Sequence, residues 1–292
     1  MQRRACTQAN ALAKSHNQTK TKNKRIKMNS YFGIFKMQFK GEMQYRAKAF
    51  SGVFTQFFWG LMYICLYTAF MKDGVVNGFS LSQMTTYVWL GQAFFAMRFI
   101  GVGKNVPSEI VNGNVCYKFV RPINIYNIWY AEYMGERLAS TILRFIPILV
   151  VAFLLPQGFN MTLPVSLTAF GLFALSLILG FLITGAISMF TVNIIFKTLS
   201  PRGASGIVAT VCSLLGGGYI PLPLMPQKLQ MILNYMPFRF VTDLPFRIYI
   251  GNIDTKNALI YIAISVAWLV VLVALGKLIT KKNLKRAVIQ GG

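Results

Sequence analysis

Few side chains in this sequence could carry out chemistry. The chain holds one histidine, four cysteines and seven acidic residues. The histidine, His16, lies in a basic segment at the start, and the cysteines form no CxxC pair. A Ser-His dyad, an H-E-x-x-H zinc site and a His-rich cluster each need partners that a single histidine in such a segment does not have. We therefore expect no catalytic residue and no metal site on this chain.

A nucleotide site is not expected either. The P-loop pattern is G-x-x-x-x-G-K-[ST], whereas residues 101–104 read G-V-G-K and lead into Asn105, without the first half of the motif. The seven acidic residues fall outside the long apolar stretches, whereas proton-driven carriers keep a titratable carboxylate inside the membrane. If the chain moves a solute uphill, the energy source must lie on another chain, and we expect no cofactor on this one.

The composition indicates the class of protein, and with it the kind of structural elements that would position a site. Of the 292 residues, 55% are hydrophobic and 13% are charged, and the mean hydropathy is +0.51. An ordinary soluble domain carries about 25% charged residues, so a soluble globular protein is excluded. The net charge of +23 would suit nucleic acid, but the apolar bulk points to a lipid bilayer as the partner and not to nucleic acid.

Six apolar stretches are long enough, or nearly so, to cross a bilayer. A membrane-spanning helix needs about 20 apolar residues, at 1.5 Å each, to cross roughly 30 Å of hydrocarbon. The predicted fold is therefore an all-α polytopic membrane protein with six transmembrane helices and a permease domain over residues 31–292. The predicted spans cover residues 49–71, 84–103, 138–155, 165–196, 206–224 and 258–280.

The basic residues predict the orientation of these spans. With six spans both termini lie on one side, and 23 of the 30 Lys and Arg residues fall on that side. Five fall on the opposite side, and Arg98 and Arg144 fall inside spans. Since basic loops face the cytoplasm, both termini are predicted to be cytoplasmic.

Residues 1–30 form a basic segment that we expect to be disordered. Residues 1–27 lack the apolar core of a signal peptide. Three interpretations stay open: a basic tail with a role, a transit-like segment, or an upstream extension from a misassigned start at Met28. Over residues 31–43, aromatic and apolar side chains recur near helical spacing. This pattern is typical of an amphipathic helix in the headgroup plane, either a plain lead-in to the first span or a functional connector.

The connection between the second and third spans is the first candidate site. Pro107 followed by Ser108 can begin a short helix, and Gly113 can end it. Arg121 and Pro122 then close the segment. A short helix held beneath two spans would let a soluble subunit push on the membrane helices. An ordinary amphipathic loop is the alternative.

The fifth span and the segment after it form the second candidate site. Residues 206–219 would make only about 21 Å of helix, and glycines and prolines then interrupt it. Residues 227–249 nevertheless stay apolar, so we expect re-entrant helices before the sixth span, because irregular backbone at membrane depth needs cover from protein or a water-lined cavity. A surface-lying hairpin without a gating role is the alternative. The interrupting residues are Gly216, Gly217, Gly218, Pro221, Pro223 and Pro226.

Two arginines lie inside predicted spans, where each needs an interaction partner for its charge. Arg98 lies near the cytoplasmic end of the second span, so we expect it to snorkel to lipid phosphates. Arg144 lies about two turns into the third span, just before Pro147. For Arg144, pairing with Glu132 or Glu136 and contact with an anionic substrate head group both stay open.

The order of these features resembles a known family. It looks like that of ATP-binding-cassette (ABC) type-2 permeases, the membrane subunits of ABC exporters, over residues from about 31 to 285. The resemblance implies a dimer, with a second copy or a related permease, and a separate ATPase subunit that carries ATP and Mg²⁺. The residues that carry the resemblance are 42–71, Glu109, Ile110, Gly113, Asn114, Arg121, Pro122, 221–226, Pro237, Phe238, Pro245 and Gly251.

The resemblance also implies roles for individual residues. Residues 108–119 are similar in position to the coupling helix of that family, which docks on the ATPase subunit, and a re-entrant pair there caps the outer exit of the pathway. The expected ATPase-coupling residues are Ser108, Glu109, Asn112, Gly113, Asn114, Arg121 and Pro122. The expected pathway or gate residues are Arg144, Gly216, Gly217, Gly218, Pro221, Pro237 and Phe238.

The expected function is that of the permease subunit of an ATP-driven ABC exporter in the plasma membrane, which in a bacterium is the inner membrane. An ATPase-independent secondary carrier or channel and a non-transporting membrane scaffold are the alternatives, with sodium coupling through backbone carbonyls still open. Drugs, lipids, peptides, sodium and polysaccharides all suit an apolar, aromatic-rich pathway. The aromatic residues that could line such a pathway, or pack in the core, are Trp59, Tyr63, Phe94, Phe95 and Phe99.

Overall fold

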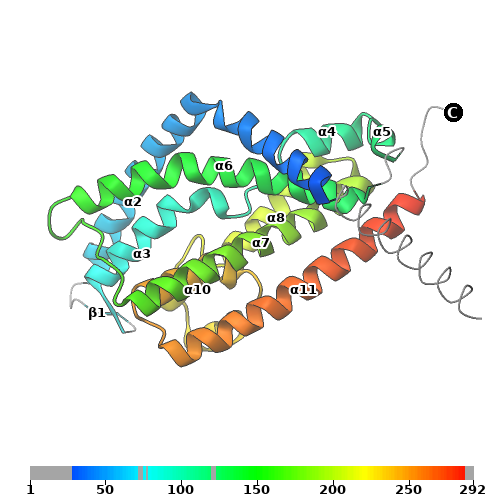
Figure 1. Cartoon of the computed structure of the whole chain (residues 1–292). Helices are drawn as coiled ribbons and strands as arrows, with labels where there is room; N and C mark the ends of the chain where they lie inside the picture. The colour runs from blue at the N-terminus through cyan, green and yellow to red at the C-terminus, as the bar shows by residue number, and fades with distance from the viewer. Residues whose placement is uncertain (1–27, 72–74, 77, 120–122, 287–292) are drawn as a thin grey trace, which may run out of the picture.

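Long helices lying side by side make up most of the protein (Figure 1). The computed structural model describes residues 28–71, 75–76, 78–119 and 123–286. Within these ranges the chain is helical apart from loops and one short antiparallel hairpin, β1 (Val75–Val76) with β2 (Phe79–Ser80). The hairpin lies at one end of the long helices, and the short helices α4 (Asn105–Val111) and α5 (Cys116–Phe119) lie at the other (Figure 1).

Four helices in the described part of the chain are long and apolar enough to cross a membrane. At 1.5 Å per residue, each exceeds the roughly 30 Å of a hydrocarbon core. They correspond to the first, third, fourth and sixth predicted spans. The four helices are α2 (Arg46–Phe70), α6 (Ile125–Leu154), α7 (Leu167–Thr198) and α11 (Thr255–Arg286).

The second predicted span contains a shorter helix than expected. Helix α3 (Leu81–Ala93) has 13 residues, or about 20 Å, and a short 3-10 turn, η1 (Phe95–Met97), follows it. An uninterrupted helix over residues 84–103 is therefore wrong. The helix cannot continue because Arg98 has an extended backbone and Gly101 a positive φ of 153°.

The fifth predicted span is also shorter and begins earlier. Helix α8 (Pro201–Leu215) has 15 residues and opens with its proline, which the first turn of a helix tolerates. It ends at Gly216, and Gly217, at φ +78°, turns the chain away from a helical path. Because α3 and α8 are short, the six-span topology stays a prediction.

Helix α6 begins well before the predicted start at residue 138. The side chain of Asn124 caps its first turn and accepts the N–H of Asn127 at 3.3 Å. The early start places Glu132 and Glu136 on the helix instead of in a loop. It also lets the helix over residues 28–43 pack across the first half of α6, where Ser140 donates to Glu42 at 2.9 Å.

Helix α7 lies at the centre of the bundle. Helices α6, α8 and α11 pack along it, together with α10 (Asp243–Tyr249). Two glycines allow the close approaches: Gly180 faces the backbone of Phe240, and Gly185 faces the side chain of Met134. A side chain at either glycine would overlap its neighbour.

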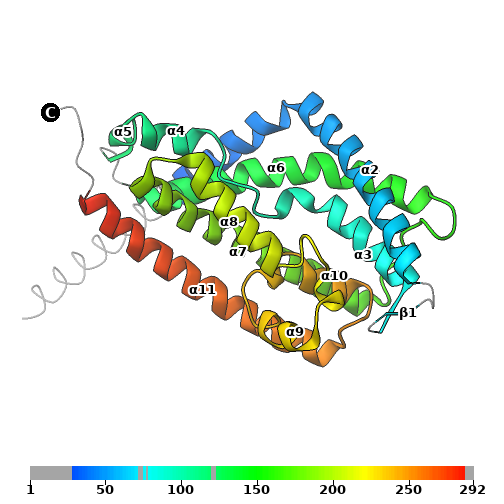
Figure 2. The same cartoon turned by 180° about the vertical axis from the view of Figure 1, so that it is seen from behind.

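Short helices fill the segment between α8 and α11. The structure therefore contains the short helices expected after the glycine run, and their re-entrant placement stays a prediction. Figure 2 shows α9 and α10 near the start of α11. The elements of the segment are η2 (Leu222–Leu224), α9 (Gln227–Leu233), η3 (Arg239–Val241) and α10.

Candidate functional site

A cavity of about 560 Å³ lies between α2, α3 and the turn after α8. Its volume is within the range of about 300–1,000 Å³ that is usual for small-molecule sites. Polar groups on the wall are few, and Gln56 and Gln92 are among them. The wall is rich in aromatic residues and includes four of the five that the sequence suggests. The fifth, Phe94, stacks on Phe145 instead. The lining aromatic residues include Trp59, Tyr63, Tyr67, Tyr87, Phe95 and Phe99.

Arg98 is the single charged residue among the described residues that line this cavity. Its Nη1 donates to the carbonyl oxygen of Gly218 at 3.2 Å, and its guanidinium lies 5.7 Å from the ring centre of Phe95. Its Nε is buried and has no hydrogen-bond partner in the described part of the chain. The prediction that Arg98 snorkels to lipid phosphates is wrong, because the side chain turns inward, toward the glycine run.

The glycine run closes one side of the cavity. Gly217 and Gly218 line it together with Pro221. Behind Arg98, Gly216 and Phe238 border a small pocket of about 20 Å³, and a Cβ at Gly216 would lie 2.9 Å from the carbonyl oxygen of Phe238. The structure thus brings these five predicted pathway residues together, with Pro237 buried beside Phe238. Their role as a pathway stays a prediction.

Arg144, the seventh predicted pathway residue, lies apart from this group. Its guanidinium packs against α2, where a Cβ at Gly52 would lie 2.8 Å from its Cζ. The predicted pairing with Glu132 or Glu136 is not found among the described residues: Glu132 lies 2.7 Å from Lys118, and Glu136 packs against residue 103. The early start of α6 explains this, because it turns both carboxylates toward the short helices.

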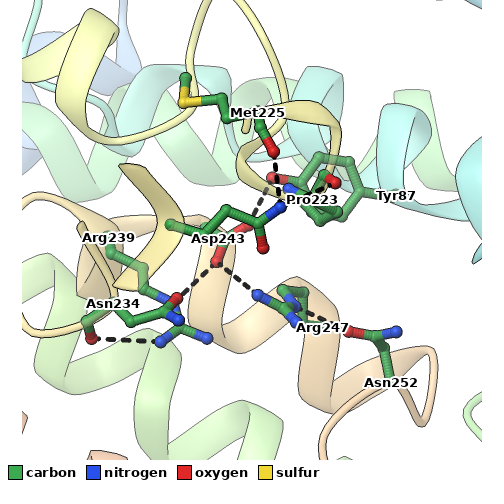
Figure 3. A network of polar contacts seen from close by, with 9 residues as sticks. Tyr87, Pro223, Met225, Asn234, Arg239, Asp243, Arg247 and Asn252 are labelled. Atoms are coloured by element: carbon green, nitrogen blue, oxygen red, sulfur yellow. Dashed lines mark hydrogen bonds and ion pairs between the residues drawn. The ribbon is translucent and has the colours of Figure 1, made fainter. Parts of the chain in front are cut away.

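A buried ion cluster lies next to the cavity (Figure 3). The carboxylate of Asp243, at the start of α10, accepts hydrogen bonds from Arg239 Nε at 2.9 Å and from the hydroxyl of Tyr87 at 3.0 Å. Arg247 Nη1 lies 3.8 Å from the same carboxylate. The Asp243 side chain is 0% exposed and that of Arg239 is 1% exposed. Because Tyr87 also lines the cavity, the cluster and the cavity share a wall.

Each arginine of the cluster makes further contacts, although Arg247 Nη1 is buried without a hydrogen-bond partner among the described residues. Arg239 Nη1 donates to the carbonyl oxygen of Asn234 at 3.1 Å, and its guanidinium lies 4.5 Å from the ring centre of Tyr261 on α11. Arg247 Nε donates to Asn252 at 2.8 Å. On sequence alone, Arg239 and Arg247 contribute only to the predicted topology, and Asp243 contributes only to the argument against a proton-driven carrier. The alternation of Arg, Asp and Arg at i, i+4 spacing was the signal that could have identified the cluster.

Helices α4 and α5, at the other end of the bundle, contain the predicted coupling residues (Figure 1). Helix α4 begins at Asn105, earlier than the predicted start at Ser108, because Pro107 fits a first turn in which no N–H is needed. It ends as predicted: Gly113 has a positive φ of 74°. Ser108 and Asn112 face outward, whereas the opposite side of α4 is buried.

Lys118 connects this loop to α6 through two ion pairs. The Nζ of Lys118 lies 2.7 Å from a carboxylate oxygen of Glu109 and 2.7 Å from one of Glu132. Glu109 is therefore held within the chain, although its side chain keeps 27% exposure. Tyr117 is 75% exposed. Arg121 and Pro122, which were predicted to fix the return to α6, lie outside the described residues.

We define the outward-facing part of this loop as the α4–α5 surface. It is a narrow patch on a fixed base, with polar and apolar side chains in alternation. Such a patch has no chemistry of its own, but it can make contacts with a second protein. The residues of the α4–α5 surface are Ser108, Val111, Asn112, Gly113, Asn114 and Tyr117.

Comparison with known proteins places these features in a family. No curated protein matched the chain. The family model described as ABC-2 family transporter protein matches residues 57–291. The match covers more than half of the chain and includes the ion cluster, the α4–α5 surface and all of the cavity wall except Thr55 and Gln56. It confirms the resemblance to ABC type-2 permeases. The chain belongs to the ABC-2 family of membrane transporter proteins.

Proposed function

We propose that this chain is the permease subunit of an ATP-driven ABC exporter, and that a separate ATPase subunit, which carries ATP and Mg²⁺, docks on the α4–α5 surface. The observation that carries the proposal is this exposed patch at one end of an ABC-2 family chain, on a loop that Lys118 joins to α6 through ion pairs. Two copies of the chain, or this chain and a related permease, would form the pathway. The cavity supports this arrangement, since its neighbours Trp59 and Tyr219 are still exposed in the single chain.

Six passages of the membrane, with both termini in the cytoplasm, are part of the proposal. Helix α3 and the stretch that follows it lead from the hairpin end of the bundle to α4 (Figure 1). Short helices can cross where neighbouring protein covers the backbone, and ten of the 13 residues of α3 are buried. Lys277, Lys281 and Lys285 lie toward the α4–α5 end of α11, in agreement with a cytoplasmic side there in the plasma membrane, or the bacterial inner membrane.

The contacts of α4 suggest how movement of the ATPase would reach the cavity. Helix α4 packs on α7, and Lys118 links Glu109 to Glu132 on α6. A push on the α4–α5 surface would therefore move α6 and α7 together. Since η1 packs on α6 and α8 packs on α7, the position of the cavity walls would follow. The short helices after the glycine run would act as re-entrant elements at the outer exit.

Co-purification from native membranes tests the proposal. A tagged chain is expected to bring down a soluble subunit with a P-loop, identified by mass spectrometry. Tyr117→Asp should remove this subunit, whereas Tyr45→Asp, at a similarly exposed tyrosine outside the surface, should retain it. Absence of any such ATPase from the unaltered chain would contradict the proposal and favour the carrier, channel or scaffold alternative.

A second experiment tests coupling in the assembled complex. Glu109→Arg places a cation beside Lys118 and should disturb the α4–α5 surface without altering the membrane helices. We expect expression to survive while ATP hydrolysis of the reconstituted complex loses its stimulation by substrate and transport falls. Unchanged hydrolysis and transport would contradict a coupling role for this loop.

A further inference from the structure

We infer that the cavity binds an amphiphile with a single anionic head group, and that the guanidinium of Arg98 holds this group. The inference names the substrate class of the exporter and rests on the proposed function to that extent. Binding itself requires only the permease chain. Three observations carry it: the missing acceptors around Arg98, the contrast with the buried Arg239, and the nature of the cavity wall.

Arg98 has fewer acceptors than its chemistry requires. A guanidinium has five N–H donors and no acceptor, but the one hydrogen bond of Arg98 in the described part of the chain is the one to Gly218. The ion pairs of the described residues involve Lys48, Lys118, Arg239 and Arg247, and none includes Arg98. A cation without a counter-charge in apolar surroundings is unfavourable. A carboxylate, sulfate or phosphate group beside Arg98 would remove this deficit.

Arg239 shows how this chain satisfies an arginine with a structural role. It has a carboxylate partner in Asp243, a carbonyl partner in Asn234 and an aromatic partner in Tyr261. Arg98 has carbonyl and aromatic partners, but among the described residues it has no carboxylate partner. The position that a carboxylate would take faces the cavity, because Arg98 lines it. The geometry therefore leaves this position to a ligand.

The wall indicates the rest of the ligand. Trp59, Tyr63 and Tyr67 lie in sequence along one face of α2, with ring centres 5.9 and 6.2 Å apart. Such a row of rings packs against an alkyl chain or an aryl group. Aromatic faces can also attract cations, but no carboxylate lines the described part of this wall and Arg98 would repel a cation. One anionic head and one apolar body fit both features.

Competition between amphiphiles of equal length tests the inference. The purified chain in phosphatidylcholine nanodiscs is titrated with the fluorescent probe 11-(dansylamino)undecanoic acid, and the probe is displaced with laurate, dodecanol or dodecyltrimethylammonium. We expect laurate to displace the probe at an about tenfold lower concentration than the other two, as for one charge-assisted contact. Equal displacement by all three, or preference for the cation, would overturn the inference.

A change of lipid distinguishes the source of the head group. If phosphatidylglycerol nanodiscs weaken probe binding, the site takes an anionic bilayer lipid, which is still an anionic amphiphile. If probe binding is the same in both discs, the ligand is a smaller amphiphile. Either result agrees with the inference as long as laurate is preferred over dodecanol.

Variants of Arg98 test whether the guanidinium carries the preference. Arg98→Gln should abolish the preference for laurate over dodecanol, and Arg98→Lys should retain part of it. Arg202→Gln, at an exposed arginine of α8 outside the cavity, is the matched control and should change nothing. A purely structural role would weaken all three amphiphiles equally, and that outcome contradicts the inference. If Arg98→Gln does not fold, Arg98→Lys and the competition series still decide.

The outcomes are separable from those of the proposed function. If the chain prefers laurate but no ATPase co-purifies with it, the anionic site is supported and the exporter function is contradicted. An ATPase partner without preference for laurate would retain the exporter and reject the site.

Discussion

Two ion clusters in this protein mirror each other in charge. In α5 one cation, Lys118, lies between the carboxylates of Glu109 and Glu132. At the start of α10 one carboxylate, Asp243, lies between two arginines. Asp243 has no exposed surface, but every member of the Lys118 cluster keeps some. The same three-charge arrangement is therefore placed once in the interior and once near the surface.

The difference in burial implies a difference in purpose. Breaking a buried ion pair leaves an unsolvated charge behind, whereas water replaces a lost partner at the surface. The Asp243 cluster holds η3 and α10 against α3 and α11, directly behind the cavity. In the Lys118 cluster water can replace a lost partner, which suits the proposed docking of a second protein on the α4–α5 surface.

Among the substitutions in the two clusters, Asp243→Asn is expected to cause the largest loss of stability. The change leaves Arg239 and Arg247 without a counter-charge in the interior. We expect a loss of about 3–5 kcal/mol in stability, seen as a large fall in the melting temperature of the purified protein. A variant as stable as the unaltered chain would mean that water reaches the cluster.

A triple substitution separates charge from shape. Arg239→Met, Asp243→Leu and Arg247→Met together remove all three charges and keep similar volumes. Such neutral replacements of a buried cluster are often tolerated, so the triple variant should be more stable than Asp243→Asn alone. The reverse order would show that hydrogen-bond geometry, and not the unpaired charge, is decisive.

Gly180→Ala should have the next largest effect, at the base of the same cluster. The added methyl group would overlap the backbone of Phe240 in η3. Overpacking of this kind costs about 1–3 kcal/mol, and thermal melting measures it. Gly171→Ala on the same helix is the matched control, since a Cβ there meets nothing within 4 Å. Equal losses of stability at both positions would contradict the close packing of η3 on α7.

Glu132→Gln tests the surface side of the comparison. Both carboxylate oxygens of Glu132 lie within 3.0 Å of Lys118, so its loss should exceed that of Glu109→Gln. We expect about 0.5–1.5 kcal/mol, far less than for Asp243→Asn, with melting temperature again as the measurement. If Glu132→Gln lowered the melting temperature as much as Asp243→Asn, the proposed difference between the surface cluster and the buried cluster would be contradicted.

The long helices were predictable because their apolar runs are unbroken. Helix α7 matches the predicted span at residues 165–196 closely. Helix α3 was overextended because residues 94–103 remain apolar on average, whereas the break depends on the backbone at Arg98 and Gly101. Hydropathy averages over such a break and cannot locate it.

The cavity and the ion cluster needed partners that are remote in the sequence. Tyr87 meets Asp243 across 156 positions, and Arg98 meets Gly218 across 120. Sequence spacing could suggest the Arg-Asp-Arg alternation on one segment, but not the tyrosine that completes it. The α4–α5 loop, in contrast, is local: the glycine that ends α4 was identified from sequence, and only its first residue was misplaced.

The smallest expected effect concerns Asp254, an exposed carboxylate that follows the buried Asp243 in the sequence. It lies just before α11 and accepts hydrogen bonds from the Asn257 side chain at 2.6 Å and from the Asn257 N–H at 3.3 Å. These bonds hold the pKa of Asp254 below its ordinary value of 3.8. A carboxyl whose pKa is lower in the folded than in the unfolded chain adds stability above the unfolded pKa. That stability is lost as the pH falls through the folded pKa.

Asp254→Asn keeps an acceptor at the first turn but cannot titrate. The unaltered chain should therefore melt slightly higher than the variant at neutral pH, and this difference should disappear as the pH falls below 3.8 and the carboxylate becomes protonated. Melting temperatures of both proteins across this range measure the gap. A gap that does not change with pH would show that the charge of Asp254 adds nothing to the cap.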